Sequence, residues 1–242
     1  MSRPAVRSAG LLCYGERTGL PTLLSATADL SSILPFDAVQ AHFSDVVECS
    51  EMRLAQLDRI MSECRSDMFL LATNCATRAK QLFVPNLDTA PLFPFLGSSD
   101  PKVIHAFGDL IGEPAIKDIY ACRCTVNGQL VASLLISHVF PNDLYIGMIT
   151  FADPSKPLHE NQRKSVMQRH KGLGLLPTFM GRVERCAQSR KCDRITLVAN
   201  ETSQMTLFAK YGFAVDNYEV AQQKVSSGKL IPMNKTVSQA AT

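Results

Sequence analysis

Two apolar segments joined by Asn127-Gly128 constrain the fold of this chain more than any other feature of its sequence. Asn-Gly between apolar runs is the strongest short-range signal for a β-hairpin, because both residues tolerate a positive φ angle. The flanking runs predict strands over 119–126 and 129–140, and a further apolar run predicts a third strand over 144–151. The middle of the chain is therefore predicted to form an antiparallel sheet.

A glycine-rich loop, Arg169-His170-Lys171-Gly172-Leu173-Gly174, lies directly before an apolar-striped run over 175–190. This run predicts a helix, because its apolar residues recur at about 3.6-residue spacing: Leu175, Leu176, Phe179, Val183 and Cys186. Pro177 fits only in the first turn of a helix, which places the helix start near Gly174. Glycines at a helix N-terminus leave N–H groups uncovered at the positive end of the helix dipole, so the loop predicts an anion site. A flexible loop before a surface helix is the alternative interpretation of the same pattern.

The C-terminal part continues with a predicted strand over 194–199, a helix over 202–210 and Gly212 as its end. This order resembles the GNAT family of acyl-CoA-dependent N-acyltransferases. The resemblance is carried by Arg169-x-x-Gly172-x-Gly174, by Lys210-Tyr211-Gly212-Phe213 and by a closing strand over 230–235. It covers roughly residues 115–237, about half of the chain.

The resemblance implies an α/β fold with a mixed, mostly antiparallel central sheet flanked by helices. We expect that domain over 66–237, after a mainly helical N-terminal extension over 1–65 and before a disordered tail over 238–242. In the family a first strand and two helices precede the hairpin. Either residues 67–115 supply these elements, or the first strand lies near 6–14, and the sequence leaves both alternatives open.

The N-terminal half gives weaker local signals. Helical spacing of apolar residues predicts one long helix or two shorter ones over 36–65, and residues 67–73 are interpreted as a buried strand. Prolines and glycine mark 85–101 as a linker, and a helix is expected to begin over 101–111. Residues 152–168 are interpreted as an insertion between the third strand and the glycine loop.

The resemblance implies transfer of an acetyl group from acetyl-CoA to a primary amine of a small molecule or protein, by direct attack on the thioester. It assigns coenzyme A binding to the glycine loop, to the end of the third strand where the family splays two strands, and to two later residues. These residues are Ile149, Thr150, Phe151, Arg169, His170, Lys171, Gly172, Leu173, Gly174, Asn200 and Phe208. The alternatives are a non-catalytic acyl-CoA-binding or protein-interaction module, and a synthase that joins an acyl group to an amino-acid-derived amine.

The catalytic candidates are Tyr211, His138 and Asp153. Many family members carry a proton-donating tyrosine where this chain has Phe208, which has no proton to donate. Tyr211 is the nearest phenol, although a core position explains it equally. Histidine titrates near the pH range that suits a general base, but His138 also fits a hydrogen-bonded strand residue.

Charge and cysteine content complete the expectations. Residues 1–149 carry 11 Lys+Arg against 15 Asp+Glu, a net of −4, and residues 150–242 carry 14 against 7, a net of +7. The positive half contains the glycine loop and would attract an anionic nucleotide. The eight cysteines include no C-x-x-C pair, so free thiols are expected and no metal site. We further expect a cytoplasmic protein without a membrane span, which binds no nucleic acid and is free to form a homodimer.

Overall fold

The central sheet has eight strands among the residues that the computed structural model describes, which are 28–83, 106–109, 111–163, 168–217 and 219–238. Its order is β1-β2-β3-β4-β6-β8-β7, and the short β5 pairs with the far end of β4. Neighbouring strands are antiparallel except for the parallel pair β4–β6. The predicted mixed, mostly antiparallel sheet is confirmed. The strands are β1 (Glu48–Arg53), β2 (Ile116–Val126), β3 (Gln129–Val139), β4 (Asp143–Pro157), β5 (His170–Gly172), β6 (Arg194–Glu201), β7 (Ala214–Val215) and β8 (Lys229–Thr236).

The predicted hairpin is the β2–β3 pair. Asn127 has a φ angle of 51° and Gly128 one of 74°, as a two-residue turn with positive φ at both positions requires. Val126 pairs with Gln129 directly across this turn. The third predicted strand is β4, which extends six residues beyond its predicted end and takes in the start of the presumed insertion.

The two C-terminal helices also agree with prediction. They are α6 (Leu176–Ser189) and α7 (Thr202–Ala209), and α6 buries Phe179, Val183 and Ala187 against the sheet. Gly212 follows α7 with a φ angle of 82°, a conformation that favours glycine at the end of a helix. A further helix, α8 (Glu219–Ser227), was not predicted.

The prediction of helix over 36–65 is wrong in its middle. Two short helices, α1 (Phe36–Gln40) and α2 (Leu57–Glu63), flank the strand β1, which pairs with β2. Only Met52 of β1 is buried, so this edge strand lacks the alternating apolar pattern that would identify it. A domain boundary at residue 65 would separate β1 from its partner strand.

Residues 67–73 do not form the predicted strand but belong to α3 (Arg65–Phe83). Their apolar run resembles a buried strand, yet the buried positions continue at helical spacing to Ala79: Met68, Leu71, Ala72, Cys75, Ala76 and Ala79. The described order is therefore β1, α2, α3, the helical residues 106–109 and then the hairpin. The first described strand, β1, lies before residues 67–115, which supply no strand ahead of the hairpin among their described residues. The proposed strand near 6–14 and the linker over 85–101 lie outside the described residues, and residues 106–109 are helical as expected.

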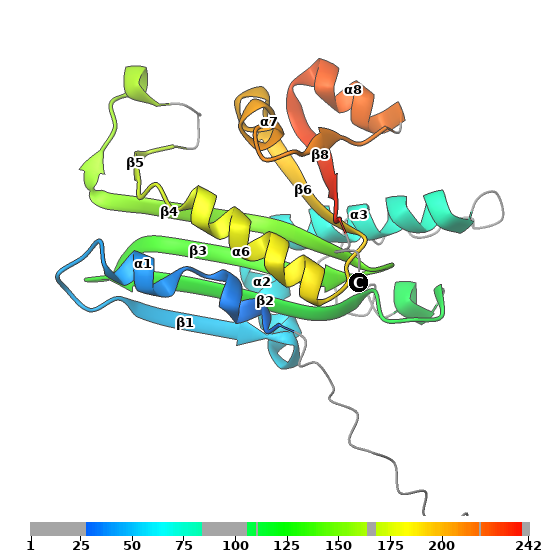
Figure 1. Cartoon of the computed structure of the whole chain (residues 1–242), viewed down its shortest axis with the longest axis horizontal. Helices are drawn as coiled ribbons and strands as arrows, with labels where there is room; N and C mark the ends of the chain where they lie inside the picture. The colour runs from blue at the N-terminus through cyan, green and yellow to red at the C-terminus, as the bar shows by residue number, and fades with distance from the viewer. Residues whose placement is uncertain (1–27, 84–105, 110, 164–167, 218, 239–242) are drawn as a thin grey trace, which may run out of the picture.

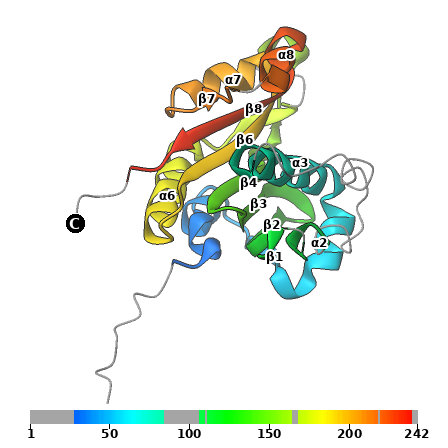
Figure 2. The same ribbon diagram turned by 90° about the vertical axis from the view of Figure 1, so that its right-hand side faces the viewer.

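Helices cover both faces of the sheet (Figures 1 and 2). One face carries α6 together with α1 and the short helix η1 (Leu30–Ile33), and α2 and α3 cover the other. Arg182 of α6 ties η1 to this layer by donating to the carbonyl of Leu34 at 2.7 Å. Each face has its own apolar core, so a group near the sheet can be assigned to the α6 face or to the α3 face.

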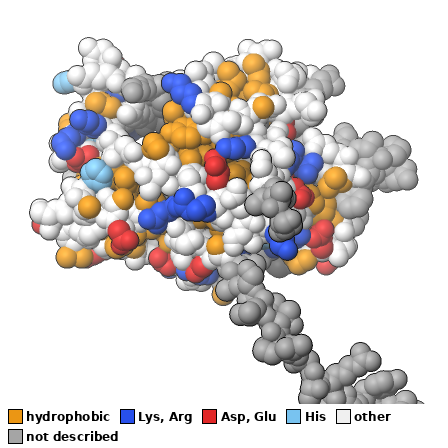
Figure 3. Space-filling view, in the orientation of Figure 1, with side chains coloured by type: hydrophobic (Ala, Val, Ile, Leu, Met, Phe, Trp, Pro, Cys, Tyr) orange, Lys and Arg blue, Asp and Glu red, His pale blue; other side chains and the backbone are white. Residues whose placement is uncertain are grey.

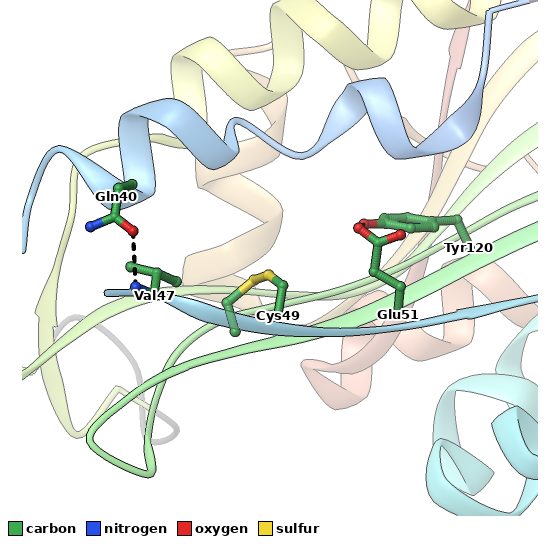
Figure 4. Close-up of a disulfide and its surroundings, with 6 residues drawn as sticks. Gln40, Val47, Cys49, Glu51 and Tyr120 are labelled. Atoms are coloured by element: carbon green, nitrogen blue, oxygen red, sulfur yellow. Dashed lines mark hydrogen bonds between the residues drawn. A yellow bond between two sulfur atoms is a disulfide. The ribbon is translucent and has the colours of Figure 1, made fainter. Parts of the chain in front are cut away.

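The expectation that the thiols are free is wrong for Cys49 and Cys124, which form a disulfide between paired positions of β1 and β2. The bond lies in the same region as Glu51, which accepts a 2.9 Å hydrogen bond from Tyr120 Oη (Figure 4). Five other cysteines of the described residues are buried and form no disulfide: Cys64, Cys75, Cys122, Cys186 and Cys192. The sequence did not predict the Cys49–Cys124 disulfide, because the two cysteines come together only when residues 48–53 form a strand beside β2.

Candidate acyl-CoA site

The parallel pair β4–β6 is open at one end. Asp143 pairs with Arg194 and Ile146 with Leu197, and there the pairing stops. Beyond Leu197, β6 continues beside β8 only, while β4 follows β3 as far as Phe151. Figure 1 shows β6 leaving β4 in this way. Within the described chain, residues 147–150 of β4 therefore have no strand neighbour on the β6 side.

A β-bulge lies where the two strands part. Leu134 pairs with Ile149 and Ile136 with Ile146, so Gly147 and Met148 together face the single residue Leu135. Glycine at position 147 leaves room for the Leu135 side chain, which would have to move to avoid a Cβ there. Bulges bend a strand and redirect its side chains, and here the bulge occurs at the start of the open segment.

The bulge also assigns the predicted β4 residues to faces. Ile149 and Phe151 pack with the core on the α6 face, whereas Met148 packs with the core on the α3 face. Beyond Ile146 and Leu197, β4 and β6 are no longer paired, and this gap between the two strands is called the split. Ile149, Thr150 and Phe151 follow on β4 and are all half-buried, so their side chains stay partly accessible. This is the segment that sequence analysis assigned to the pantetheine arm.

The glycine loop differs from the predicted cradle. Residues His170–Gly172 form β5 and pair with β4, Lys171 opposite Asp153 and Gly172 opposite Ala152. The Arg169 carbonyl accepts from Leu158 N at 2.9 Å, and Leu173 N donates to the Phe151 carbonyl at 3.1 Å. The first part of the loop is therefore held as a strand. The assignment of coenzyme A binding to the backbone from Arg169 to Gly174 stays a prediction.

The uncovered amides lie one step further along the chain. The first turn of α6 makes its first backbone bond from Phe179 N to the Leu175 carbonyl at 2.9 Å. No backbone acceptor among the described residues takes the N–H of Gly174, Leu175 or Leu176, as expected for a helix start. Gly174 has a φ angle of 74° and is exposed, with nothing within 4 Å of where a Cβ would be.

Aromatic packing brings this helix start beside the split. The rings of Phe151 and Phe179 have centroids 5.8 Å apart, and Leu173 N bonds to the Phe151 carbonyl. Figure 1 shows the first turn of α6 close to β5 and the far part of β4. The start of α6, with N–H groups that no described backbone acceptor takes, thus adjoins the open edge of β4 on the α6 face.

Asp153 lies on β4 next to the split, but it is held in local contacts. Its carboxylate accepts from Ser155 Oγ at 2.6 Å and forms an ion pair with Lys156 Nζ at 2.7 Å. The hydrogen bonds from Lys156 and Ser155 lower the pKa of Asp153 to about 2. A carboxylate with so low a pKa is a weak proton acceptor, which counts against a role as general base.

His138 lies before the open segment of β4. It pairs with Leu144, while Ile136, two residues earlier on β3, pairs with Ile146, the last β4 residue that is paired with β6. His138 Nε2 is 2.8 Å from Asn142 Oδ1, and burial lowers the pKa of the ring. These contacts are those of a hydrogen-bonded strand residue, and the role of His138 as a catalytic base stays a prediction.

The remaining predicted site residues, Asn200, Phe208 and Tyr211, lie at the end of β6, on α7 and just after α7. Asn200 is exposed at the end of β6, and its N–H donates to Gln204 Oε1 at 2.9 Å. Phe208 of α7 contacts the ring of Phe213, with centroids 6.0 Å apart. The side chain of Tyr211 packs partly buried against the core, and its carbonyl accepts from Lys235 Nζ at 2.9 Å. Their assigned roles stay predictions.

Asp67 is a residue at the split that sequence analysis missed. It lies in the first turn of α3, half-buried, and its Cβ is 3.4 Å from the position that a Cβ on Gly147 would occupy. Burial raises the pKa of Asp67 above its ordinary value. The available signal was a carboxylate at the head of the apolar run Met68-Phe69-Leu70-Leu71, which is a costly place for a charge.

The described residues contain no group of three or more histidine, cysteine or acidic side chains placed to hold a metal ion. None of the helices in the described ranges is long and apolar enough to cross a membrane.

Comparison with known proteins gave matches only among solved structures. No protein-family model matches the chain. No curated protein matches it. The structural matches include PaiA N-acetyltransferase from Thermoplasma acidophilum in complex with coenzyme A, at 9% identity and a TM-score of 0.33 over 79% of this chain and 99% of that one. The ribosomal-protein-S18-alanine N-acetyltransferase from Escherichia coli matches at 15% identity and 0.34, over 81% and 97%.

An acetyltransferase of the GNAT family from Staphylococcus aureus Mu50 matches at 12% identity and a TM-score of 0.35, over 80% of this chain and 100% of that one. In two other matches, nourseothricin acetyltransferase among them, this chain spans only 63% and 65% of the matched protein. All five matched proteins are named as acetyltransferases. Scores this low do not decide the family of this chain.

Proposed function

We propose that this chain is a divergent GNAT-like N-acyltransferase that moves an acetyl group from acetyl-CoA to a primary amine. The observation that supports the proposal most is the junction of two features on the α6 face. An edge of β4 without a described strand neighbour lies beside the start of α6, where the N–H groups of Gly174, Leu175 and Leu176 have no described backbone acceptor. The first feature suits an extended amide-bearing chain such as pantetheine, and the second suits a diphosphate.

The residues around the split fit the parts of coenzyme A. Gly174 leaves open space at the helix start, where a side chain would obstruct a phosphate. Ile149 and Phe151 offer partly accessible apolar surface along the open edge. Figure 3 shows hydrophobic side chains gathered on this face between the β5 arm and the α7–α8 region, with Lys and Arg side chains close by. When bound, acetyl-CoA supplies an acyl group that is already activated as a thioester.

The protein then has to hold the thioester beside the amine, polarise its carbonyl and accept a proton. Backbone N–H groups of 147–150 on the open edge are suited to polarise the carbonyl. Phe208 occupies the position of the family's acidic tyrosine and cannot protonate the departing thiolate. The thiolate can instead take its proton from the attacking nitrogen, directly or through water, or from Tyr211, and a thiolate is a good enough leaving group to depart without a dedicated acid.

A non-catalytic acyl-CoA-binding module is the second candidate, and Phe208 is the observation that favours it. Both functions require binding of coenzyme A, and only the first requires turnover. Isothermal titration calorimetry with acetyl-CoA tests the shared requirement. Release of free thiol from acetyl-CoA in the presence of primary amines then separates the two. No detectable binding at millimolar acetyl-CoA would overturn both.

A further inference from the structure

We propose that Asp67 receives the amine acceptor, binding its ammonium group and taking a proton from it as the nitrogen attacks the thioester. This inference rests on the N-acyl transfer proposed above and adds the residue that acts on the acceptor. It replaces His138 and Asp153 as the candidate base.

The course of α3 places Asp67 at the split. Arg78, near the far end of α3, donates to Asp143 Oδ2 at 3.1 Å at the closed end of the β4–β6 pair. Asn74, one turn earlier, lies 3.4 Å from Thr196 of β6. Asp67, two turns earlier again, adjoins Gly147, the first β4 residue beyond the pairing with β6. The helix therefore runs back along β4 and delivers its first turn to the point where the strands part.

The missing side chain of Gly147 leaves the Asp67 side chain next to the bulge. A Cβ at position 147 would lie 3.4 Å from Asp67 Cβ. The backbones of α3 and β4 therefore approach closely here, with only the Asp67 side chain between them. The ion pairs of the described residues do not include Asp67, unlike Asp143 and Asp153. The carboxylate is thus half-buried at the split, and no cation of the described residues pairs with it.

The α6 and α3 faces separate the two substrates. The N–H groups at the start of α6 belong to one face of the sheet, and α3 with Asp67 covers the other. A thioester that enters the split from the α6 face can be attacked by an amine that approaches from the α3 face. The nucleotide and the acceptor would then not compete for space.

The surroundings of Asp67 favour a cationic acceptor. Burial raises the pKa of Asp67, and only its own backbone N–H opposes this shift. Two titratable groups of the described residues interact with it electrostatically, the phenol of Tyr145 on β4 and the thiol of Cys64 after α2. Burial raises the pKa of both, so both are neutral near pH 7, and the pKa of Cys64 is further affected by Glu63 and Arg123. A buried carboxylate beside neutral groups gains most from an ammonium partner.

The transfer step balances with Asp67 in this role. The amine nitrogen bonds to the acyl carbon as the carbon–sulfur bond breaks. One proton of the ammonium passes to Asp67 and from there to water, and a second proton of the nitrogen reaches the departing thiolate. The products are the amide, coenzyme A with a free thiol, and one proton released to solvent.

The experiment compares Asp67→Asn with Asp58→Asn. Asp58 is an exposed carboxylate in the first turn of α2, so the control makes the same charge change at a helix start away from the split. The probes are acetyl-CoA with spermidine, a lysine-containing peptide and a peptide with a free α-amine. We expect kcat/KM for the amine to fall at least 100-fold in Asp67→Asn, as for the loss of a general base, and to stay within twofold in Asp58→Asn.

Three further readouts separate a catalytic role from a structural one. Acetyl-CoA affinity and Tm should match the wild type in both variants. Asp67→Glu should recover part of kcat/KM, and the acid limb of the wild-type pH profile should be absent in Asp67→Asn. Carbon-13 NMR of labelled aspartate should show one carboxyl that titrates above the ordinary range and moves when amine is added in the presence of coenzyme A.

The outcomes keep the two proposals distinct. If the wild type binds acetyl-CoA but transfers acetyl to none of the amines, the proposed enzymatic function is overturned. If the wild type transfers acetyl and Asp67→Asn retains kcat/KM within twofold, the transferase survives and the role of Asp67 is overturned. An equal loss of acetyl-CoA affinity in Asp67→Asn would also overturn this role, since the defect would then lie in the nucleotide site.

Discussion

The closed and open ends of the β4–β6 pair place carboxylates in opposite surroundings. At the closed end, Asp143 is fully buried and forms ion pairs with Arg78 at 3.1 Å and Arg194 at 2.9 Å. At the open end, about 13 Å along the strand, Asp67 is half-buried beside Gly147 and takes part in no ion pair of the described residues. The same helix, α3, covers both ends. One end is built to hold the two strands together, and the other leaves a carboxylate available to a substrate.

The largest effect is expected at the closed end. Asp143→Ala should lower the free energy of unfolding by about 3–5 kcal/mol, because it leaves the half-buried Arg78 and Arg194 without their shared counter-ion. Urea unfolding followed by circular dichroism measures this change, with Asp58→Ala as the control. Acetyl-CoA affinity of the folded protein should stay unchanged. A loss of stability below about 1 kcal/mol would contradict this expectation. It would show that Asp216, which lies 3.6 Å from Arg194, is a sufficient counter-ion in the absence of Asp143.

The second effect belongs to the open end. Gly174→Asp should weaken acetyl-CoA binding at least 100-fold, about 2.7 kcal/mol, because it puts a carboxylate among the N–H groups at the start of α6. Titration calorimetry measures the affinity.

Gly172→Ala is the matched control in the same loop. Its new Cβ would meet only the Phe151 carbonyl at 3.6 Å, an ordinary contact, and Gly172 does not have a positive φ angle. Its affinity should stay within about threefold of the wild type. Equal losses of acetyl-CoA affinity in both variants would mean that the whole loop, and not only the start of α6, binds the phosphates, as the sequence pattern alone predicts.

The parts of this comparison differ in how far the sequence could predict them. The hairpin at Asn127-Gly128, α6 and α7 were predictable because each depends on signals within a few residues, such as turn glycines and helical periodicity. The closed end could not be predicted, because Arg78, Asp143 and Arg194 meet only when α3, β4 and β6 are assembled. Asp67 was missed because its segment was interpreted as a strand.

Non-local pairing explains the other misses as well. β5 exists because β4 continues past residue 151 and accepts His170–Gly172 as a partner, and nothing within those three residues requires it. β1 is an edge strand with one buried residue, so its identity depends on β2. The Cys49–Cys124 bond follows from that register and was out of reach for the same reason.

A third effect tests the boundary between the two ends. Gly147→Ala should lower the free energy of unfolding by about 1–3 kcal/mol, because the new Cβ would collide with the Leu135 side chain in a packed core. It should also lower acetyl transfer by crowding Asp67. Gly181→Ala within α6 is the control, since its Cβ meets only Arg185 at 3.7 Å, and alanine in a helix interior stabilises by up to about 1 kcal/mol. A lower Tm for Gly147→Ala together with a higher Tm for Gly181→Ala would locate the strain at the bulge.

The smallest effect concerns Asp153, where β4 passes from the split to β5. Hydrogen bonds from Lys156 and Ser155 lower its pKa to about 2 in the folded chain. A lowered folded pKa stabilises the protein above the unfolded value of 3.8, and this contribution is lost as the pH falls through about 2. Asp153→Asn should therefore flatten the urea midpoint between pH 4 and pH 2, slightly and less so in high salt, because Lys156 is largely exposed. Acetyl transfer at pH 7 should change less than tenfold, whereas a loss comparable to that of Asp67→Asn would make Asp153 the base and reduce Asp67 to a residue that shapes the split.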